Sequence, residues 1–209
     1  MDNFYALIAR MKNIGRWALM RSVMPENVQE HSHMVAVLAH ALAVIRRDVF
    51  GTPCDVNAAA TAALYHDAGE ILTGDLPTPI KYNNPEIMAA YRQVEAEAAQ
   101  KLLEMLPESM RAAYAPLLAE SDPELKPLVK AADKLAAYIK CIEERRAGND
   151  EFLQAEKRSL ETLQGYHLPE VDYFLATFIP AFERTLDEQG TMDYREPKLN
   201  TNTISEKEN

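Results

Sequence analysis

Four side chains at three separate places in the chain could together bind a divalent metal ion: His31, His66, Asp67 and Asp133. Imidazole and carboxylate groups suit a borderline or hard ion such as Mn, Co, Fe, Ni or Zn, and the set contains no thiolate. A buried carboxylate beside an imidazole is costly unless something pairs with both groups, and a divalent ion is a common partner. Four protein ligands on a six-coordinate ion would leave positions for water and substrate.

The same four residues also have a purely structural interpretation. Adjacent histidine and aspartate residues are common, and most such pairs only form hydrogen bonds or ion pairs. Asp133 has Lys130 and Lys134 close to it in the sequence, so a lysine could neutralise it. Residue types and spacing alone therefore leave a metal site and a set of ordinary pairing groups both open. For His33 and His40, we expect hydrogen bonding rather than metal binding.

A further carboxylate follows the central His-Asp pair. The apolar pattern predicts a helix over about residues 56–72, which would place Glu70 on the same face as His66 at i+4 and Asp67 at i+3. From there, its carboxylate could hold or deprotonate a water molecule beside a metal ion. The loop that follows, residues 73–85, contains three prolines and is therefore expected to be stiff, which suits ligand contacts.

Another pair of candidates lies near the N-terminus. Gly15 ends a short amphipathic helix that we expect over residues 3–14, so Arg16 and Trp17 fall in a connection. Taken alone, Trp17 would be a core anchor and Arg16 a solvated surface charge. Side by side on a loop, they could instead offer a cation and a flat ring to a ligand.

The elements that must position these residues are all predicted to be helices. No run of residues alternates as a strand would, so we expect an all-α fold with the metal site in a cleft between helices. Residues 1–189 are expected to form one domain and residues 190–209 a polar, disordered tail. The expected helices span residues 3–14, 28–50, 56–72, 86–106, 108–120, 123–146, 150–164 and 169–188.

The composition limits the possible partners. Acidic side chains outnumber basic ones by 32 to 22, and the resulting net charge of −10 argues against nucleic acid or an anionic membrane as partner. A small phosphorylated substrate stays compatible, because a local cationic pocket can override the overall sign. No segment has the ~18 apolar residues of a membrane span, and no export signal is evident. We expect Cys54 and Cys141 to be reduced thiols in a cytoplasmic protein.

Several motifs together resemble one group of enzymes. The pair His66-Asp67, with His31 before it and Asp133 after it, is similar to the HD-domain superfamily of metal-dependent phosphohydrolases. Finer motifs resemble its bacterial 5′-deoxynucleotidases of the YfbR type, namely Arg16-Trp17, Glu30-His31-Ser32, Tyr65-His66-Asp67-Ala68 with Glu70, Leu72-Thr73-Gly74-Asp75-Leu76-Pro77-Thr78-Pro79-Ile80-Lys81-Tyr82, Lys130-Ala131-Ala132-Asp133, Ala136-Ala137-Tyr138-Ile139-Lys140 and Asp172-Tyr173-Phe174. The resemblance covers about residues 3–188, and Gly69 stands where such chains often carry serine.

This resemblance implies an HD-domain helical bundle and an enzyme that hydrolyses deoxyribonucleoside 5′-monophosphates to deoxyribonucleosides and phosphate, while disfavouring ribonucleotides. It also implies a homodimer, with cobalt as the usual metal and manganese or another transition metal as a substitute. The metal ligands would be His31, His66, Asp67 and Asp133. The catalytic residues would be Glu70, Arg16 and Asp75. The substrate site would comprise Arg16, Trp17, His31, Asp67, Asp75, Leu76, Pro77, Thr78 and Asp133.

The implied roles are chemically reasonable. Arg16 would orient the phosphate through forked donors that a lysine could not reproduce. Trp17 would lie against the sugar and disfavour a 2′-hydroxyl, although a pocket built for CH₂ rejects an added hydroxyl by only about 10²-fold. Asp75 could accept a hydrogen bond from a sugar hydroxyl or protonate the leaving alkoxide, and the sequence leaves both roles open.

Two other functions fit parts of the pattern. One is another HD-type nucleotide phosphohydrolase, such as a deoxynucleoside triphosphate hydrolase. A triphosphate site should need several cations, and near the proposed site the sequence offers only Arg16, Arg21 and Lys81. The other is a non-catalytic helical protein with a structural metal ion, which would need a closed ligand shell and would give Glu70 no task.

Overall fold

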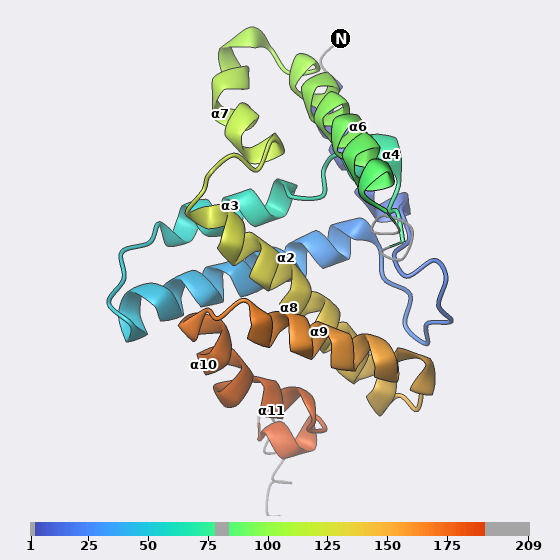
Figure 1. Cartoon of the computed structure of the whole chain (residues 1–209), viewed down its shortest axis with the longest axis vertical. Helices are drawn as coiled ribbons and strands as arrows, with labels where there is room; N and C mark the ends of the chain where they lie inside the picture. Colours follow the sequence, from blue (N-terminus) through green and yellow to red (C-terminus); the bar gives the residue numbers. More distant parts are fainter. Residues whose placement is uncertain (1–2, 78–83, 191–209) are drawn as a thin grey trace, which may run out of the picture.

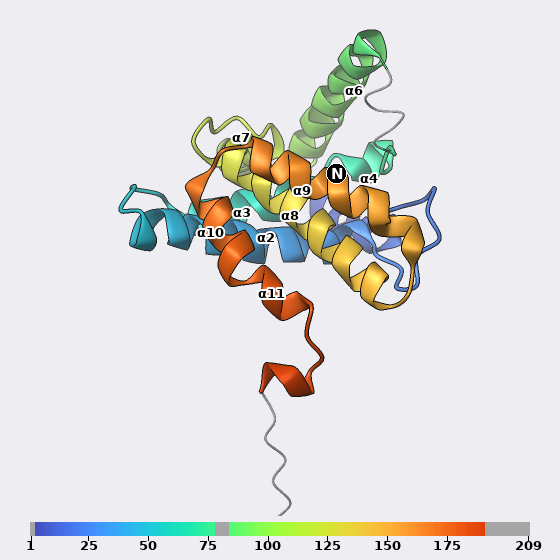
Figure 2. The same ribbon diagram turned by 60° about the horizontal axis from the view of Figure 1, so that its bottom comes forward.

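The computed structural model describes residues 3–77 and 84–190 of the chain. Within these ranges the regular elements are helices, which confirms the predicted all-α fold (Figures 1 and 2). In chain order they are α1 (Phe4–Ile8), η1 (Met11–Asn13), α2 (Val28–Val44), η2 (Ile45–Val49), α3 (Val56–Tyr65), α4 (Glu70–Thr73), α6 (Pro85–Glu104), α7 (Glu108–Leu118), α8 (Leu125–Arg146), η3 (Asp150–Phe152), α9 (Leu153–Gly165), α10 (Pro169–Thr177), α11 (Ile179–Phe182) and η4 (Asp187–Gln189).

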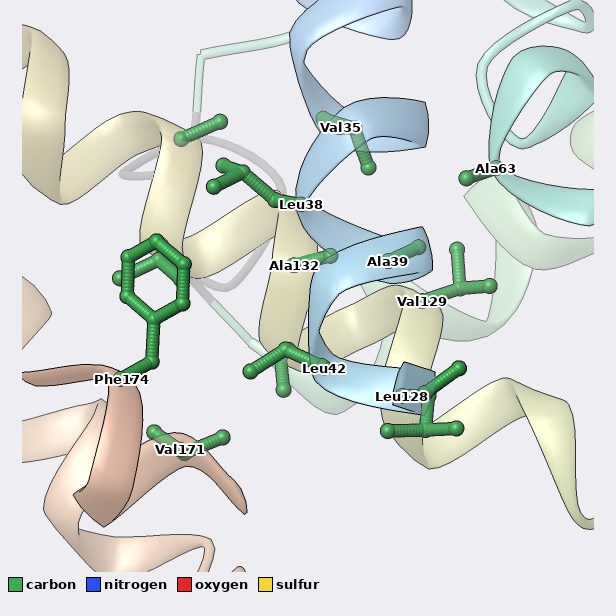
Figure 3. Close-up of a cluster of buried hydrophobic side chains, with 14 of the residues drawn as sticks. Val35, Leu38, Ala39, Leu42, Ala63, Leu128, Val129, Ala132, Val171 and Phe174 are labelled. Carbon is green, nitrogen blue, oxygen red and sulfur yellow. The ribbon is translucent and has the colours of Figure 1, made fainter. Parts of the chain in front are cut away.

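The centre of the molecule is the packing of α2 against α3 and α8. Ala39 of α2 and Ala132 of α8 are both fully buried, and such small side chains let two helices approach closely. Other buried apolar residues surround them, and Figure 3 shows this cluster, with Val35, Leu38 and Leu42 on α2, Leu128 and Val129 on α8, Ala63 on α3, and Val171 and Phe174 on α10. These three central helices are the ones that carry or lead into the candidate metal ligands.

The start of α2 is fixed by a capping box. The side chain of Asn27 accepts hydrogen bonds from the backbone N–H groups of Gln29 and Glu30, and the Glu30 carboxylate accepts one from the backbone N–H of Asn27. Such reciprocal bonds satisfy the free donors of the first turn. His31 follows directly after these residues, near the start of the helix that the cap defines.

A second apolar cluster supports the turn that follows α3. Its buried members are Phe4 of α1, Leu102 of α6, and Ala68 and Leu106, which lie outside regular helices. Ala68 stands between the His66-Asp67 pair and Glu70, so burying its methyl group anchors the segment that carries all three polar residues. Figure 2 shows α6 rising from this region, away from the central helices.

The expected continuous helix over residues 56–72 is wrong. α3 ends at Tyr65, the next residues form a tight turn, and α4 begins at Glu70. The ring nitrogen Nδ1 of His66 lies 2.7 Å from the carbonyl oxygen of Ala63, which is the acceptor that the backbone N–H of Asp67 would use in a continued helix. Competition for this carbonyl gives a physical reason for the break. Glu70 therefore does not share a continuous helix face with His66 and Asp67.

The expected helix over residues 169–188 is also wrong, because it is divided into α10, α11 and η4. Pro180 explains the first break, since proline lacks an N–H and its ring clashes with the carbonyl four residues earlier. The expected helix over 3–14 is likewise divided into α1 and η1, and short helices of this kind depend on tertiary packing. The expected helix over 28–50 changes at Ile45 into the π-helical turn η2.

The other predicted helices are present, with shifts of a few residues at their ends. In the helix predicted over 150–164, the first turn is the 3₁₀ helix η3. In the described part of the chain, no helix is long and apolar enough to cross a membrane. Nearly all of the expected tail, from residue 191 on, lies outside the described residues, so its predicted disorder stays a prediction.

Candidate active site

The structure brings His31, His66, Asp67 and Asp133 together from three different places in the fold. His31 comes from the first turn of α2, His66 and Asp67 from the turn after α3, and Asp133 from the middle of α8. One ligand atom each from His31, His66 and Asp133 lies within 4.8 Å of the others, as a shared metal ion would require. The Oδ2 atom of Asp67 lies 3.1 Å from Nε2 of His66 and 3.6 Å from Nε2 of His31.

The imidazole nitrogens that face this centre fit a metal ion. Nε2 of His31 and Nε2 of His66 are both buried without a hydrogen bond of acceptable geometry, although Nε2 of His31 is 3.0 Å from Oδ1 of Asp133. Because the carbonyl of Ala63 can only accept, Nδ1 of His66 must carry a proton, which leaves the lone pair of a neutral ring on Nε2. Such a second bond is how proteins orient metal-binding histidines.

The electrostatics of the centre favour a positive charge there. Burial disfavours ionisation of Asp133, but the close approach and charge of His31 outweigh it and hold the pKa of Asp133 well below its usual range. Asp67 behaves in the same way, with burial outweighed by His66, so its pKa is also lowered. Burial opposes protonation of His66, yet the charges of Asp67 and Asp133 raise its pKa to about 9. A divalent cation would satisfy the same field in place of a proton.

Arg16 adjoins the metal cluster through Asp67. Its Nη1 lies 3.3 Å from Oδ2 of Asp67, and its Nε lies 3.2 Å from Oε2 of Glu26. The side chain is 13% exposed, so the guanidinium is held in the site rather than solvated. Burial would lower the pKa of Arg16, but the charges of Asp67 and Asp133 outweigh it and raise that pKa. A fixed cation beside a metal cluster is suited to binding a phosphate.

Trp17 is fixed in an unusual backbone conformation next to Arg16. Its φ angle of 60° lies in the left-handed region, which costs a residue other than glycine roughly 1–2 kcal/mol. Its indole N–H donates to Oε2 of Glu26 at 2.9 Å, and its ring packs against the buried ring of Phe152 with centroids 5.2 Å apart. These contacts keep the half-buried ring in one place beside Arg16.

Two more carboxyl groups complete the polar lining. Oε2 of Glu70 is buried without a hydrogen-bond partner among the described residues. Burial, together with the charges of Asp67 and Asp75, raises the pKa of Glu70 to about 9, and a bound cation would act in the opposite direction. The charge of Asp75 reaches both Glu70 and Arg16, which places Asp75 in the same region.

The predicted nucleotide loop is only partly described. Asp75, Leu76 and Pro77 are half-buried and follow Gly74, where α4 ends with a φ angle of 74°. Thr78, which the resemblance assigns to the substrate site, and Lys81 lie outside the described residues. His33 and His40 are exposed on α2 and stand apart from the cluster.

Sequence reasoning missed Glu26, a polar residue in the segment just before α2. A polar turn residue gives no sign of a long-range partner, and its contacts with Arg16 and Trp17 emerge only when the chain folds back on itself. It also missed the buried pair Lys140–Glu144 of α8, which follows the i,i+4 spacing of helical ion pairs. Oxygens of Glu144 accept from the backbone N–H groups of Val23 and Met24, so this pair anchors the connection that follows Trp17.

Comparisons with known proteins agree on the kind of protein this chain resembles. Residues 3–182 match the model of a family described as "5′-deoxynucleotidase YfbR-like". The chain is 53% identical over 189 residues to a 5′-deoxynucleotidase of Vibrio cholerae, covering 90% of this chain and 97% of the relative. It is 50% identical over 190 residues to a 5′-deoxynucleotidase of Yersinia pestis, covering 90% and 96%.

Solved structures share the fold. An HD-domain phosphohydrolase from Listeria innocua superposes with a TM-score of 0.77 at 23% identity, covering 90% of this chain and 92% of the other. The HD phosphohydrolase of cyanophage S-2L, solved with dA and one catalytic Zn²⁺ ion, superposes with a TM-score of 0.61 at 24% identity, covering 86% and 96%. At this level of identity, the likeness concerns the fold alone.

Proposed function

This chain belongs to the YfbR-like 5′-deoxynucleotidase family, and we propose that its active site is the cluster of His31, His66, Asp67 and Asp133 with Arg16 beside it. The protein is a phosphoric monoester hydrolase that converts deoxyribonucleoside 5′-monophosphates into deoxyribonucleosides and phosphate. The observation that carries the assignment of the site is the ion pair between Arg16 and Asp67, because it joins a phosphate-binding cation to the metal cluster.

His31, His66, Asp67 and Asp133 would hold a divalent metal ion, which polarises the phosphoryl group and lowers the pKa of a bound water when it is present. Around it, the protein must fix the phosphate and guide the attacking water. Arg16 has five N–H donors, of which one is bonded to Glu26 and one to Asp67. Its remaining donors suit two oxygens of a phosphate in a fork-like contact.

Glu70 is the group that we assign to the attacking water. Its carboxyl lies within the electrostatic reach of Asp67 and Arg16, and its buried Oε2 has capacity to accept a hydrogen bond. In hydrolysis, the water oxygen forms a bond to phosphorus while the bond from phosphorus to O5′ breaks. Glu70 would take the proton of the water, and the departing O5′ atom must receive a proton in turn.

The sugar would lie against Trp17 and the segment Asp75–Pro77. A rigid ring held against the 2′ carbon would oppose an added hydroxyl by its bulk and by burying that hydroxyl without a partner. We therefore propose that ribonucleotides are poorer substrates rather than excluded ones. Asp75 could bind a sugar hydroxyl or supply the proton to O5′, and Thr78 would complete this part of the site.

The metal is a divalent ion, and we propose cobalt, with manganese or another transition metal as a substitute. Two imidazoles and two carboxylates form a mixed nitrogen and oxygen set that suits borderline ions better than Ca²⁺ or a thiophilic ion. A fold neighbour that binds Zn²⁺ supports the general class of ion without deciding which one this chain uses.

We also propose that the protein acts as a homodimer in the cytoplasm. The rings of Phe50, Tyr173 and Phe178 are in contact at the surface and each is more than a third exposed, as expected of an interface. Light scattering on the purified protein would measure the mass of the assembly directly.

Cys54 and Cys141 are both unpaired, which suits a reducing compartment such as the cytoplasm.

The first experiment is phosphate release from dAMP and AMP in parallel by metal-stripped protein, with cobalt, manganese, magnesium or no metal added back. We expect phosphate release to depend on metal, with a kcat/KM about 10²-fold higher for dAMP than for AMP. Asp133→Asn should lose the response to metal, whereas His33→Ala, which changes an exposed histidine of the same helix as His31, should keep it.

Absence of release with every metal would refute the proposed function. Release from dATP but not from dAMP would instead favour a triphosphate hydrolase. Equal rates for dAMP and AMP would leave the phosphatase activity standing but would remove Trp17 from the discrimination between sugars.

A further inference from the structure

A single oxygen atom joins the two residues to which we assign the phosphate and the sugar. Oε2 of Glu26 accepts from Nε of Arg16 at 3.2 Å and from the indole Nε1 of Trp17 at 2.9 Å. The Glu26 side chain is 17% exposed, so these bonds are largely shielded from water. Charge-assisted bonds in such a setting are stronger than neutral ones and hold their donors in a narrow range of orientations.

Glu26 is itself held by the backbone. The carbonyl of Glu26 accepts from the N–H of Arg16 at 2.9 Å, and the N–H of Val28 donates to the carbonyl of Ile14 at 3.0 Å. With the bridge between Gly15 and Asn27, these bonds pair the segment before Trp17 with the segment that leads into α2. The carboxylate therefore reaches Arg16 and Trp17 from a fixed base.

Each of the two donors is constrained on its other side as well. Nη1 of Arg16 is bonded to Asp67, so the guanidinium is held between Glu26 and a candidate metal ligand. Trp17 packs on Phe152, and its left-handed backbone is closed by a bond from the N–H of Met20 to its carbonyl. Loss of the Glu26 carboxylate would free the indole N–H and one edge of the guanidinium together.

We propose that Glu26 is a positioning residue that locks Arg16 and Trp17 into one unit, so that sugar discrimination depends on a carboxylate that does not touch the substrate. The predicted loss of sugar discrimination rests on the proposed function, whereas the predicted loosening of Trp17 does not. Because the backbone bonds use the carbonyl of Glu26 and not its side chain, variants of that side chain should still fold.

Trp17 is the only tryptophan in the chain, which makes it a direct reporter of its own position. In Glu26→Ala, we expect the acrylamide quenching constant of the intrinsic fluorescence to rise about twofold, because an indole without a hydrogen-bond partner moves toward solvent. Glu26→Gln keeps an acceptor oxygen, so its quenching constant should lie between those of wild type and Glu26→Ala. Glu30→Ala is the matched control, since Glu30 lies in the same helix start and its carboxylate accepts from the backbone N–H of Asn27, with no bond to Arg16 or Trp17.

The kinetic test uses the ratio of kcat/KM for dAMP to that for AMP. Both substrates carry the same phosphate, so an effect through Arg16 cancels in this ratio and an effect through Trp17 remains. We expect the ratio to fall about tenfold in Glu26→Ala, as a hydroxyl-rejecting pocket loosens, and to stay at the wild-type value in Glu30→Ala. Trp17→Phe keeps a flat ring but has no N–H to donate to Glu26. Adding Glu26→Ala to Trp17→Phe should therefore change the ratio little further.

Failure of this inference is distinct from failure of the proposed function. If wild type hydrolyses dAMP but Glu26→Ala has wild-type quenching and a wild-type ratio, the positioning role is refuted and the activity stands. If wild type hydrolyses neither substrate, the proposed function is refuted, and the quenching result alone decides whether Glu26 holds Trp17.

Discussion

At the scale of single residues, the candidate site is a buried region with an excess of carboxyl groups. Asp67, Asp133, Glu70 and Asp75 influence one another there, and Arg16 is the fixed cation among them. Burial and the charges of Asp67 and Asp75 raise the pKa of Glu70, whereas the neighbouring histidines lower the pKa values of Asp67 and Asp133. Such divergent pKa values among neighbouring carboxyl groups are typical of functional sites.

Glu70 begins α4, after the turn that carries His66 and Asp67, so its proposed role as a base can be tested apart from metal binding. Glu70→Gln keeps the size of the side chain but cannot accept a proton, so we expect kcat for dAMP to fall by about 10²–10⁴-fold. Metal content, measured by mass spectrometry of the purified protein, should be unchanged. Asp67→Asn serves as the comparison and should lose bound metal. Loss of metal in Glu70→Gln as well would make Glu70 a ligand.

At the scale of elements, the segment from α3 to α4 is built to present side chains rather than to extend a helix. Gly74 ends α4 with φ 74° and ψ 164°, a combination open essentially only to glycine, and it directs the chain into Asp75. Gly69, by contrast, has φ −58° and ψ −28°, which any residue can adopt. A side chain at Gly69 would meet the Cβ of Ala98 at 3.9 Å, an ordinary contact.

These two glycines should therefore respond differently to the same substitution. Gly74→Ala is expected to cost about 1–3 kcal/mol of backbone strain, lowering Tm by about 5 °C and reducing kcat/KM for dAMP as Asp75 moves. Gly69→Ala should change neither quantity appreciably. Thermal unfolding and steady-state kinetics on both variants would test this, and equal effects would show that the conformation of Gly74 is not what positions Asp75.

The elements also show which parts of the fold the sequence could predict. The cap and apolar periodicity of α2 are local features, so its start at Val28 and its buried face follow from pattern alone. Pro180 likewise marked a break that a stricter use of proline geometry would have found. The break after Tyr65 depends on a bond from the His66 ring to the carbonyl of Ala63, which leaves no periodic signal.

The site was predictable to a similar extent. The types and spacing of His31, His66, Asp67 and Asp133, with the resemblance, were enough to expect them in one place, and the structure brings them together. The support around them was not predictable, because Glu26 meets Arg16 and Trp17 only through the pairing of two connections.

At the scale of the whole molecule, a metal ion bound by these residues would join α2, the turn after α3, and α8. Because binding to the folded state alone stabilises it, we expect saturating cobalt to raise the Tm of metal-stripped protein by about 5–10 °C. His31→Ala should abolish this shift. His33→Ala, on the exposed face of the same helix, should retain it. Differential scanning fluorimetry would measure all three, and an undiminished shift in His31→Ala would place the metal elsewhere.

The distribution of the ligands over α2, the α3 turn and α8 also has a consequence for the newly made protein. A ribosome delivers His31, His66 and Asp67 well before Asp133, and at ~5–20 residues per second the nascent chain spends several seconds with an incomplete set. The apolar face of α2 lacks part of its cover during the same interval, because α8 supplies that part while α3 is already present. The arrival of α8 adds both its share of the core and the last of the four proposed ligands, so we expect a nascent chain that ends before α8 to lack a complete metal site.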